Sequence, residues 1–512
     1  SNPILPWDLR SAGTAFSVAA NYSFEGSFSL FIALTGIFIV CILAWKCGIT
    51  FSGRARVIGV LAGLVVGFAF FRFVQTDLCF DTFGMYDIPF TQWMNYRKNG
   101  LFIGFIQNLK YIAVEVPEGY SPEAAAALIE AYIDDGRGSD APSSGNRPNI
   151  IVIVDEAFSD LSVLGDLETS QEVMPYYDLL AGSEDTITGT LCVSVLGGNT
   201  ANSEFEFLTG ASMAFLPAGS VPYQQFITRD TPSLAWMLRD SGYTTVASHP
   251  YGASGWNRNA VFPRLGFSRA LFENDFTTPG QLRIYRSDEA DFAMLERISE
   301  EYASEDLFQF NITMQNHGSY FRTYDDFTPY ISVGDRPLGT WPKAETYLSL
   351  INTTDTALSY LIGYYEECGE DTVIVFFGDH QPTLLENAFF AELLGKPVDR
   401  LTDEEAAARY EVPFLIWANF DIEEATDVVT SANYLSLLVA DACGIGRSDY
   451  MEFLARIRED YPVVTANFYY DAEGEFHRID GLDGLPQELQ DYALVQYGLL
   501  FDPDELSEYC LR

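Results

Sequence analysis

The chain has 512 residues, of which 72 are acidic and 29 are basic, and its formal net charge at pH 7 is −43. This length allows roughly two or three domains, each with enough residues to bury a core. So negative a chain repels nucleic acid and anionic membrane surfaces, which excludes the binding of polyanions through a basic patch.

Two apolar segments near the start of the chain are each long enough to cross a bilayer as a helix, at about residues 28–46 and 56–74. Two buried core helices are the weaker alternative, because both segments are apolar on all sides. A short basic turn joins them and marks the cytoplasmic side, so everything after the second span should lie outside the cell. We therefore predict a partial membrane domain over residues 1–76 of a multi-pass cell-membrane protein, and we expect one or more earlier spans to be missing.

Residues 77–147 are predicted to form a juxtamembrane segment and a linker. The mixed pattern of residues 90–111 fits either a helix along the membrane surface or a helix docked on the next domain. Ser121 and Pro122 are typical of a helix start, and the Ala-rich stretch after them continues the helix to about Ile133. Residues 134–147 are rich in Gly, Ser, Asp and Pro, which indicates a linker and a domain boundary near residue 147.

Residues 148–512 alternate between strand-like and helix-like patterns. Unbroken apolar runs at 149–154 and 373–377 predict strands that are buried on both faces. Further strands are expected at 244–248, 308–314 and 412–418, and helices at 233–241 and 347–367. This alternation predicts an α/β fold with a mostly parallel sheet sandwiched by helices.

Three of the four histidines follow apolar strand-like runs: His249, His317 and His380. Ligands of open α/β sheets bind just beyond the carboxyl ends of the strands. One such histidine could be structural, but three of them favour a shared site. His477 lies in an acidic stretch near the end of the chain and is expected to be a solvated surface residue.

Glu156, Asp379 and His380 follow two of the predicted strands and offer two carboxylates and one imidazole. This oxygen-rich set suits Mn²⁺ or Mg²⁺ better than Zn²⁺. Thr200 is the best candidate for a fourth ligand, because it follows flexible glycines and Asn199 at the start of a helix-like segment. Backbone N–H groups there favour an anion, and a hydroxyl on a cation can act as a nucleophile. A plain N-cap is the alternative for Thr200.

The seven cysteines show no metal-ligand spacing. Five of them would lie outside the membrane and could pair, with a connectivity that the sequence does not fix: Cys79, Cys192, Cys368, Cys443 and Cys510.

Several blocks in the same order resemble the lipoteichoic acid synthase and phosphoglycerol transferase branch of the alkaline phosphatase/sulfatase superfamily. They are Pro148-Asn-Ile-Ile-Val-Ile, Gly198-Asn-Thr-Ala-Asn-Ser-Glu-Phe-Glu, His249-Pro-Tyr-Gly-Ala-Ser-Gly-Trp-Asn-Arg258, Met314-Gln-Asn-His-Gly318 and Gly378-Asp-His-Gln-Pro382. The resemblance covers nearly the whole chain. It implies an alkaline phosphatase/sulfatase-like catalytic domain over residues 148–512, outside the cell and anchored by membrane helices.

The resemblance also implies residue roles. One Mn²⁺ ion, with Mg²⁺ or Zn²⁺ as alternatives, would be held by Glu156, Thr200, Asp379 and His380, and Thr200 would also be the nucleophile.

Five further residues would surround the substrate. Trp256 and Arg258 would line a glycerol-phosphate pocket, with His249 close to it, and His317 would contact the phosphate or assist the leaving oxygen. Asn199 stands where some lipoteichoic acid synthases carry a lysine, so the preference for the donor can differ here.

The activity implied is that of a phosphoglycerol transferase. Glycerol phosphate would pass from phosphatidylglycerol, through a covalent phospho-threonine, to a glycolipid, teichoic acid or glycan acceptor in the cell envelope. The alternatives are a transferase or phosphodiesterase that modifies a glycan, and a catalytically silent glycan-binding protein of the same fold. No Cys/Ser-x-Pro-x-Arg block surrounds Thr200, which argues against sulfate-ester hydrolysis.

Overall fold

The computed structural model describes residues 53–74, 92–109, 114–133, 147–384 and 386–511. The chain divides into two compact units, one of residues 1–114 with 217–219 and one of residues 115–216 with 220–512. The predicted three-part division at residues 76 and 147 stays a prediction.

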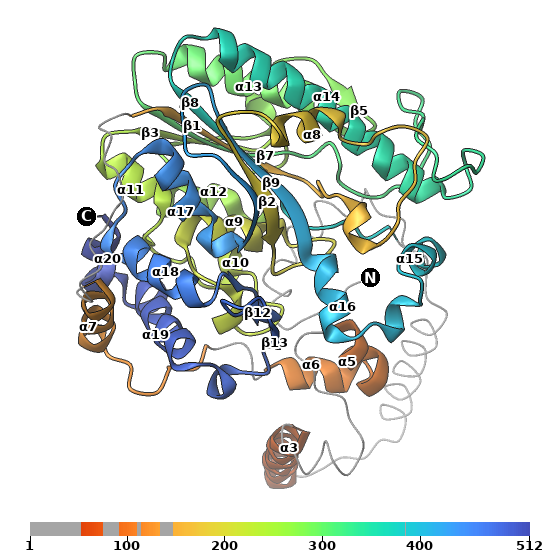
Figure 1. The fold of residues 1–512 in the computed structure, drawn as a ribbon. Helices are drawn as coiled ribbons and strands as arrows, with labels where there is room; N and C mark the ends of the chain where they lie inside the picture. Colours follow the sequence, from red (N-terminus) through yellow and green to blue (C-terminus); the bar gives the residue numbers. More distant parts are fainter. Residues whose placement is uncertain (1–52, 75–91, 110–113, 134–146, 385, 512) are drawn as a thin grey trace. The chain divides into compact units, whose positions relative to one another are not determined.

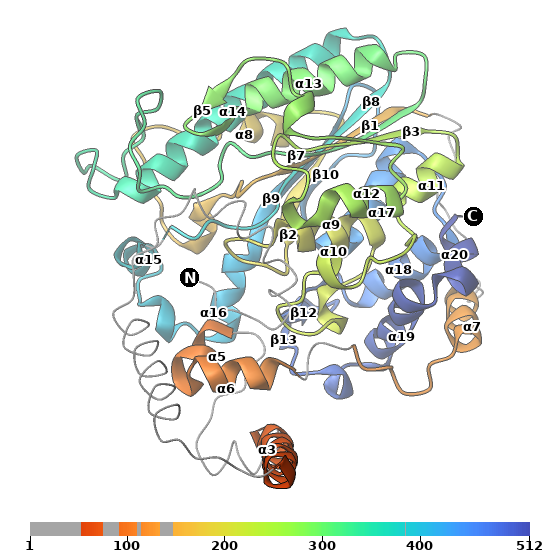
Figure 2. The same ribbon diagram turned by 180° about the vertical axis from the view of Figure 1, so that it is seen from behind.

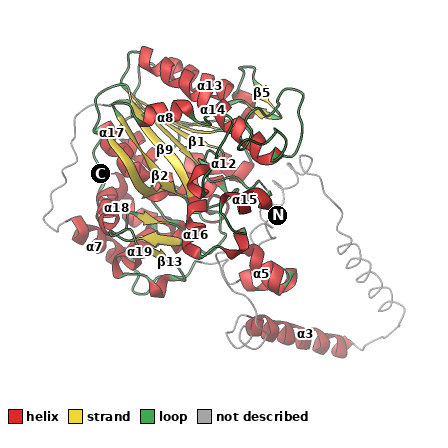
Figure 3. Cartoon of the chain, turned by 45° about the vertical axis from the view of Figure 1, so that its right-hand side comes forward, coloured by secondary structure: helices red, strands yellow, loops and turns green. Residues whose placement is uncertain are grey.

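The described part of the first unit consists of three helices, α3 (Gly53–Val74), α5 (Gln92–Asn99) and α6 (Leu101–Asn108). Within α3, Val57–Val74 is long and apolar enough to cross a membrane, and it is the one such helix among the described residues. The predicted span at 28–46 lies outside the described residues. Gly100, with φ 80°, separates α5 from α6. Figure 3 shows α3 as one continuous helix.

The second unit is built around an eight-stranded sheet with the order β10-β2-β9-β8-β1-β7-β3-β4. Neighbouring strands are parallel except β9, which is antiparallel to both β2 and β8. The predicted mostly parallel α/β sheet is therefore confirmed. The strands are β1 (Asn149–Asp155), β2 (Thr186–Cys192), β3 (Thr244–Ser248), β4 (Arg269–Leu271), β7 (Leu307–Ile312), β8 (Thr372–Gly378), β9 (Glu411–Ala418) and β10 (Ala425–Ser431).

Helices cover both faces of the sheet (Figures 1 and 2). One face carries α8 (Pro175–Ala181), α13 (Asp288–Glu301) and α14 (Pro342–Glu367), and the other carries α9 (Thr200–Thr209), α11 (Leu234–Asp240), α12 (Arg258–Arg264) and α17 (Ala432–Cys443). Successive residues of β8 show how the two layers form, because side chains of a strand alternate between faces. Phe376 packs edge-on against Phe158, with ring centroids 4.8 Å apart, whereas Phe377 contacts Phe207 of α9 on the opposite face.

The remaining elements lie around this sandwich. They are α7 (Pro122–Ile133), α10 (Pro222–Gln225), the hairpin of β5 (Gln281–Leu282) and β6 (Tyr285–Arg286), α15 (Asn387–Leu393), α16 (Asp403–Ala407), α18 (Asp449–Asp460), the small sheet of β11 (Val463–Val464), β12 (Phe468–Tyr470) and β13 (Phe476–Arg478), α19 (Gln487–Phe501) and α20 (Pro503–Leu511).

Two helix starts follow from local chemistry. The N–H of Ala124 donates to Ser121 Oγ at 3.1 Å, so the predicted cap begins α7. Helix α14 begins at Pro342, earlier than the predicted residue 347, because proline fits the first helical turn without losing a hydrogen bond.

Four of the cysteines are described, and all four are free: Cys192, Cys368, Cys443 and Cys510.

Candidate active site

The site lies where β1 and β8 end side by side. Asp155 is paired with Gly378 in the parallel register, so the residues after them, Glu156 and Asp379, leave the sheet together. His380 Nε2 lies 3.2 Å from Asp379 Oδ2 and 3.9 Å from Glu156 Oε1. These three residues, named here the acidic triad, are buried, and their ligand atoms lie within 4.8 Å of one another.

Two atoms of the acidic triad are buried without a hydrogen-bond partner. Asp379 Oδ1 accepts the N–H of Ala157 at 2.7 Å, but Asp379 Oδ2 has no partner. His380 Nδ1 lies 3.1 Å from the carbonyl oxygen of Gln381, to which it donates, and Nε2 has no hydrogen-bond partner. Buried polar atoms are nearly always hydrogen-bonded. Asp379 Oδ2 and His380 Nε2 lie 3.2 Å apart, and neither makes a hydrogen bond, so together they fit the ligand atoms of a divalent cation.

The raised pKa of Glu156 also indicates that negative charge in the acidic triad is not compensated. Burial, and then the charge of Asp379, raise the pKa of Glu156 to about 8, while His380 and Arg258 oppose the shift. A cation next to the carboxylate would favour its ionised form and remove this penalty.

Thr200 is the first residue of α9, and its Oγ1 lies 3.5 Å from Glu156 Oε2. Asn199 precedes it in the left-handed region with φ 67° and is half-buried. Ser203 Oγ donates to the carbonyl oxygen of Asp379 at 2.7 Å, which ties the first turn of α9 to the end of β8. The hydroxyl of Thr200 therefore lies beside Glu156 of the acidic triad, and its role as a fourth ligand stays a prediction.

Arg258 begins α12 and is buried, with 3% of its surface exposed. Its guanidinium forms an ion pair with Glu204, in which Nε lies 3.1 Å from Oε1 and 3.2 Å from Oε2. Nη1 lies 2.9 Å from Nε2 of His249. The positive charge of Arg258 lowers the pKa of Glu156 in the acidic triad, against the larger effect of burial.

His249 is held in one tautomer. Its Nδ1 donates to the carbonyl oxygen of Ile312 at 2.9 Å, so Nε2 is the acceptor for Arg258. Burial and the neighbouring charge of Arg258 hold the pKa of His249 well below its usual value. His249 is therefore a neutral acceptor for this arginine.

Trp256 lies two residues before Arg258 and is half-buried. Both Trp256 and Asn257 have positive φ, 50° and 64°, which is costly for residues other than glycine. Such strain persists where the surrounding structure requires one backbone geometry. Here the two strained residues come directly before Arg258.

His317 lies in the loop after β7. Its Nδ1 lies 2.8 Å from the carbonyl oxygen of Gly318 and 3.0 Å from the hydroxyl of Tyr285. That hydroxyl also donates to Gly318 O at 2.9 Å, so the proton of the imidazole is on Nδ1 and Nε2 carries the lone pair. Burial lowers the pKa of His317, and the negative charge of Asp379 acts in the opposite direction.

A series of ring contacts joins His249 to His317. The ring centroids of His249 and Tyr251 are 6.2 Å apart, those of Tyr251 and Tyr285 are 6.4 Å apart, and those of Tyr285 and His317 are 5.2 Å apart. Arg283 supports the same loop by donating to the carbonyl oxygens of Gln315 and His317.

Sequence reasoning missed three residues here. Glu204 stands inside a block quoted for the resemblance, four residues after Thr200, and this helical spacing could have placed both on one face of α9. Tyr285 and Arg283 carry no such signal, because the short β5–β6 hairpin that holds them is irregular in sequence.

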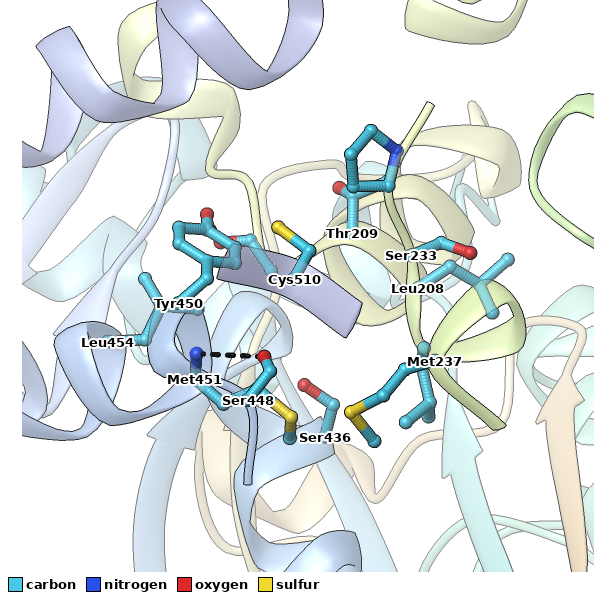
Figure 4. Close-up of a pocket in the computed structure, with 13 residues that line it drawn as sticks. Leu208, Thr209, Ser233, Met237, Ser436, Ser448, Tyr450, Met451, Leu454 and Cys510 are labelled. Atoms are coloured by element: carbon cyan, nitrogen blue, oxygen red, sulfur yellow. Dashed lines mark hydrogen bonds between the residues drawn. The ribbon is translucent and has the colours of Figure 1, made fainter. Parts of the chain in front are cut away.

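A pocket elsewhere in the unit has a different character. It lies at the C-terminal end of α9, and Leu208, Met237, Leu454 and Cys510 are among its lining residues (Figure 4). Its lining has no carboxylate and no histidine, so it does not offer the ligand set found in the acidic triad.

A second acidic group contains Asp471, Glu475 and His477, around the β12–β13 turn. These residues are partly or fully exposed, and His477 Nε2 already pairs with Asp471 Oδ2 at 2.6 Å.

Residues 148–445 match the family model described as Sulfatase, which is more than half of the chain. The chain therefore belongs to the sulfatase family. The resemblance to the lipoteichoic acid synthase and phosphoglycerol transferase branch of the alkaline phosphatase/sulfatase superfamily is confirmed by its relatives.

Two of these relatives are known from sequence. A Rhizobium meliloti protein named for cyclic beta-1,2-glucan modification is 29% identical over 90% of this chain and 71% of its own length. Lipoteichoic acid synthase 1 of Bacillus subtilis is 22% identical over 77% of this chain and 62% of its own length.

Two solved structures share the fold. The phosphoglycerol transferase GacH of Streptococcus pyogenes, in complex with sn-glycerol-1-phosphate, is similar with a TM-score of 0.61 and 20% identity, over 77% of this chain and 97% of that one. The lipoteichoic acid synthase LtaP of Listeria monocytogenes gives 0.55 and 19%, over 75% and 98%.

Proposed function

We propose that the protein is a metal-dependent phosphotransferase that moves glycerol phosphate from phosphatidylglycerol to an acceptor in the cell envelope. The observation that carries this proposal is the pair of unpartnered buried atoms, Asp379 Oδ2 and His380 Nε2, in a triad that adjoins the hydroxyl of Thr200. The named activities of GacH and the two lipoteichoic acid synthases support the choice of glycerol phosphate.

The acidic triad and Thr200 would hold one divalent cation, which we propose to be Mn²⁺, with Mg²⁺ or Zn²⁺ as alternatives. The predominance of oxygen ligands favours Mn²⁺ or Mg²⁺. When bound, the cation would supply positive charge that favours ionisation of the hydroxyl and offsets charge on the phosphoryl oxygens.

Thr200 would be the nucleophile of a double displacement. In the first step Oγ1 forms a bond to phosphorus, the bond from phosphorus to the diacylglycerol oxygen breaks, and that oxygen gains the proton that Thr200 loses. In the second step an acceptor hydroxyl attacks phosphorus and releases the threonine oxygen, which regains a proton.

Arg258 and His317 would divide the remaining work. Arg258 would bind the phosphoryl oxygens, which carry the charge that phosphoryl transfer must stabilise. His317 has a lone pair on Nε2 and would accept the proton of the incoming acceptor hydroxyl. Trp256, two residues before Arg258, and Asn199, directly before Thr200, would line the glycerol-phosphate pocket.

The acceptor is proposed to be an envelope glycan or glycolipid. The relative named for cyclic beta-1,2-glucan modification matches 90% of the chain, which favours a glycan acceptor over a growing teichoic acid polymer. Helix α3 supports membrane attachment, because a lipid donor remains in the bilayer. We propose that the catalytic unit lies on the outer side.

The test is turnover of labelled phosphatidylglycerol in membranes with Mn²⁺, comparing the wild type with Thr200→Ala. We expect diacylglycerol release to fall by at least about 1,000-fold, as when a covalent nucleophile is removed. Thr209→Ala, at the other end of the same helix, is the matched control and should keep its activity. Unchanged release by Thr200→Ala would refute the proposal.

Product analysis then separates the acceptors. A singly modified glycan supports glycan modification, a growing polyglycerol phosphate chain supports a synthase, and free glycerol phosphate supports a phosphodiesterase.

A further inference from the structure

We propose that Glu204 is a positioning residue that orients the guanidinium of Arg258 for phosphate recognition and couples it to the helix of the nucleophile. This inference rests on the role proposed above for Arg258. It concerns a carboxylate that lies outside the acidic triad and is completely buried.

The hydrogen bonds of Arg258 leave a defined set of donors. A guanidinium has five N–H groups and no acceptor. Nε and Nη2 both donate to the carboxylate of Glu204, and Nη1 donates to Nε2 of His249. One N–H therefore remains on each terminal nitrogen, and each of these groups can donate to a phosphate oxygen.

Glu204 determines which edge of the guanidinium remains available. The carboxylate of Glu204 accepts hydrogen bonds from both Nε and Nη2, so the plane of the guanidinium is fixed by more than one hydrogen bond. His249 alone would hold only Nη1, and the guanidinium could then rotate about its hydrogen bond to His249. A neutral histidine also provides no charge to offset a buried guanidinium, whereas Glu204 does.

The position of Glu204 on α9 connects this arginine to the hydroxyl of Thr200. Glu204 follows Thr200 by one helical turn, so both side chains are on the same side of one helix. Ser203, between them, is bonded to the carbonyl oxygen of Asp379 at 2.7 Å. The spacing between the attacking hydroxyl and the phosphate-binding nitrogens is therefore set by a single buried helix turn.

The test compares Glu204→Gln with Glu206→Gln in the full-length chain, in membranes supplied with Mn²⁺ and labelled phosphatidylglycerol. Glu206 is the matched control, since it is a buried carboxylate on the same helix that bonds to Ser194 and Met213 and does not contact Arg258. We expect kcat to fall about 100-fold for Glu204→Gln, the usual cost of a reacting group misplaced by about 1 Å. We expect Glu206→Gln to retain wild-type kcat, and both variants to retain Mn²⁺ affinity.

A double variant distinguishes positioning from a general structural role. If Glu204 acts through Arg258, adding Glu204→Gln to Arg258→Ala should cause no further loss of kcat. Additive losses, an equal loss for Glu206→Gln, or wild-type kcat for Glu204→Gln would overturn the inference. Thr200→Ala, measured in parallel, keeps the two proposals separate, because a fully active Thr200→Ala would refute the proposed function itself.

Discussion

The two ends of helix α9 contain similar residues but differ in hydrogen bonding and in backbone strain. At the N-terminal end, Thr200 lies beside Glu156 of the acidic triad. The other two members, Asp379 and His380, each have a buried polar atom without a hydrogen-bond partner. The residue before the helix, Asn199, has a positive φ of 67° although it is not glycine.

At the C-terminal end the corresponding groups are satisfied. The left-handed residue is Gly210, with φ 65°, where glycine has no steric penalty. Its carbonyl oxygen accepts hydrogen bonds from the hydroxyls of Tyr450 and Tyr492. Thr209 Oγ1 donates to the carbonyl oxygen of Phe205 at 2.6 Å.

This difference indicates that the N-terminal end of α9 serves the active site and that its C-terminal end serves stability. Unpartnered buried atoms and strained residues raise the free energy of the folded state, so they persist where a ligand compensates for them. The satisfied end includes the wall of an apolar pocket (Figure 4) and contributes to packing. Changes at the first end should therefore affect catalysis, and changes at the second end should affect stability.

The largest effect on metal binding is expected for Asp379→Asn. It removes a charge from the cation site while keeping an oxygen that can accept the N–H of Ala157. We expect Mn²⁺ affinity to fall more than about 100-fold, since even changes in residues that only orient metal ligands cost up to that much. Calorimetric titration of the metal-depleted protein checks this, and unchanged affinity would show that Asp379 is not a ligand.

His317→Gln should lower kcat by about 100- to 1,000-fold, as expected for loss of a general base. Because burial lowers the pKa of His317, the wild type should lose activity only as pH falls below the usual histidine value of about 6.5, where the imidazole becomes protonated. The pH profile of kcat should lose this acidic limb in the variant. If the acidic limb persists in the variant, it reflects the titration of another residue, and the role of His317 as general base is contradicted.

The sequence was sufficient to predict the buried strands and the polar residues that follow them. Buried strands such as 149–154 and 373–377 are unbroken apolar runs, and the polar residues next to them mark the carboxyl edge of a parallel sheet. The direction of β9 could not be predicted, because an apolar run reads the same in a parallel and an antiparallel strand.

The partners within the site were less accessible to sequence reasoning. The predicted phosphate-binding Arg258 is also an ion-pair partner of Glu204, and this contact joins two helices that are separated by 54 positions in the chain. Likewise, Tyr285 reaches His317 only because the β5–β6 hairpin folds back on the loop after β7. Such contacts arise from tertiary packing and leave no periodic pattern.

A smaller effect is expected in the stability of the metal-free protein. The pKa of Glu156 is about 8 in the folded state and near 4.5 when unfolded, so the folded form retains a proton that the unfolded form loses. The contribution of Glu156 to stability is complete below pH 4.5 and declines as pH rises towards 8. The thermal midpoint of the wild type, relative to Glu156→Gln, should therefore fall across this range, and a difference that is independent of pH would contradict the shift.

The smallest effect on catalysis is expected for Gly210→Ala. A Cβ at this position would lie 2.6 Å from Leu454 Cδ1, and alanine disfavours φ 65°. We expect a loss of about 1–3 kcal/mol in unfolding free energy with unchanged kcat at a temperature where the variant is folded. A large drop in kcat with normal stability would contradict the division between the two ends of α9.

The most direct measurement is anomalous diffraction at the manganese edge from crystals grown with Mn²⁺. We predict one strong peak within bonding distance of Thr200 Oγ1 and the three side chains of the acidic triad. Manganese found only at the exposed group of Asp471, Glu475 and His477, or a triad without a peak in the presence of saturating Mn²⁺, would contradict the proposed cation site.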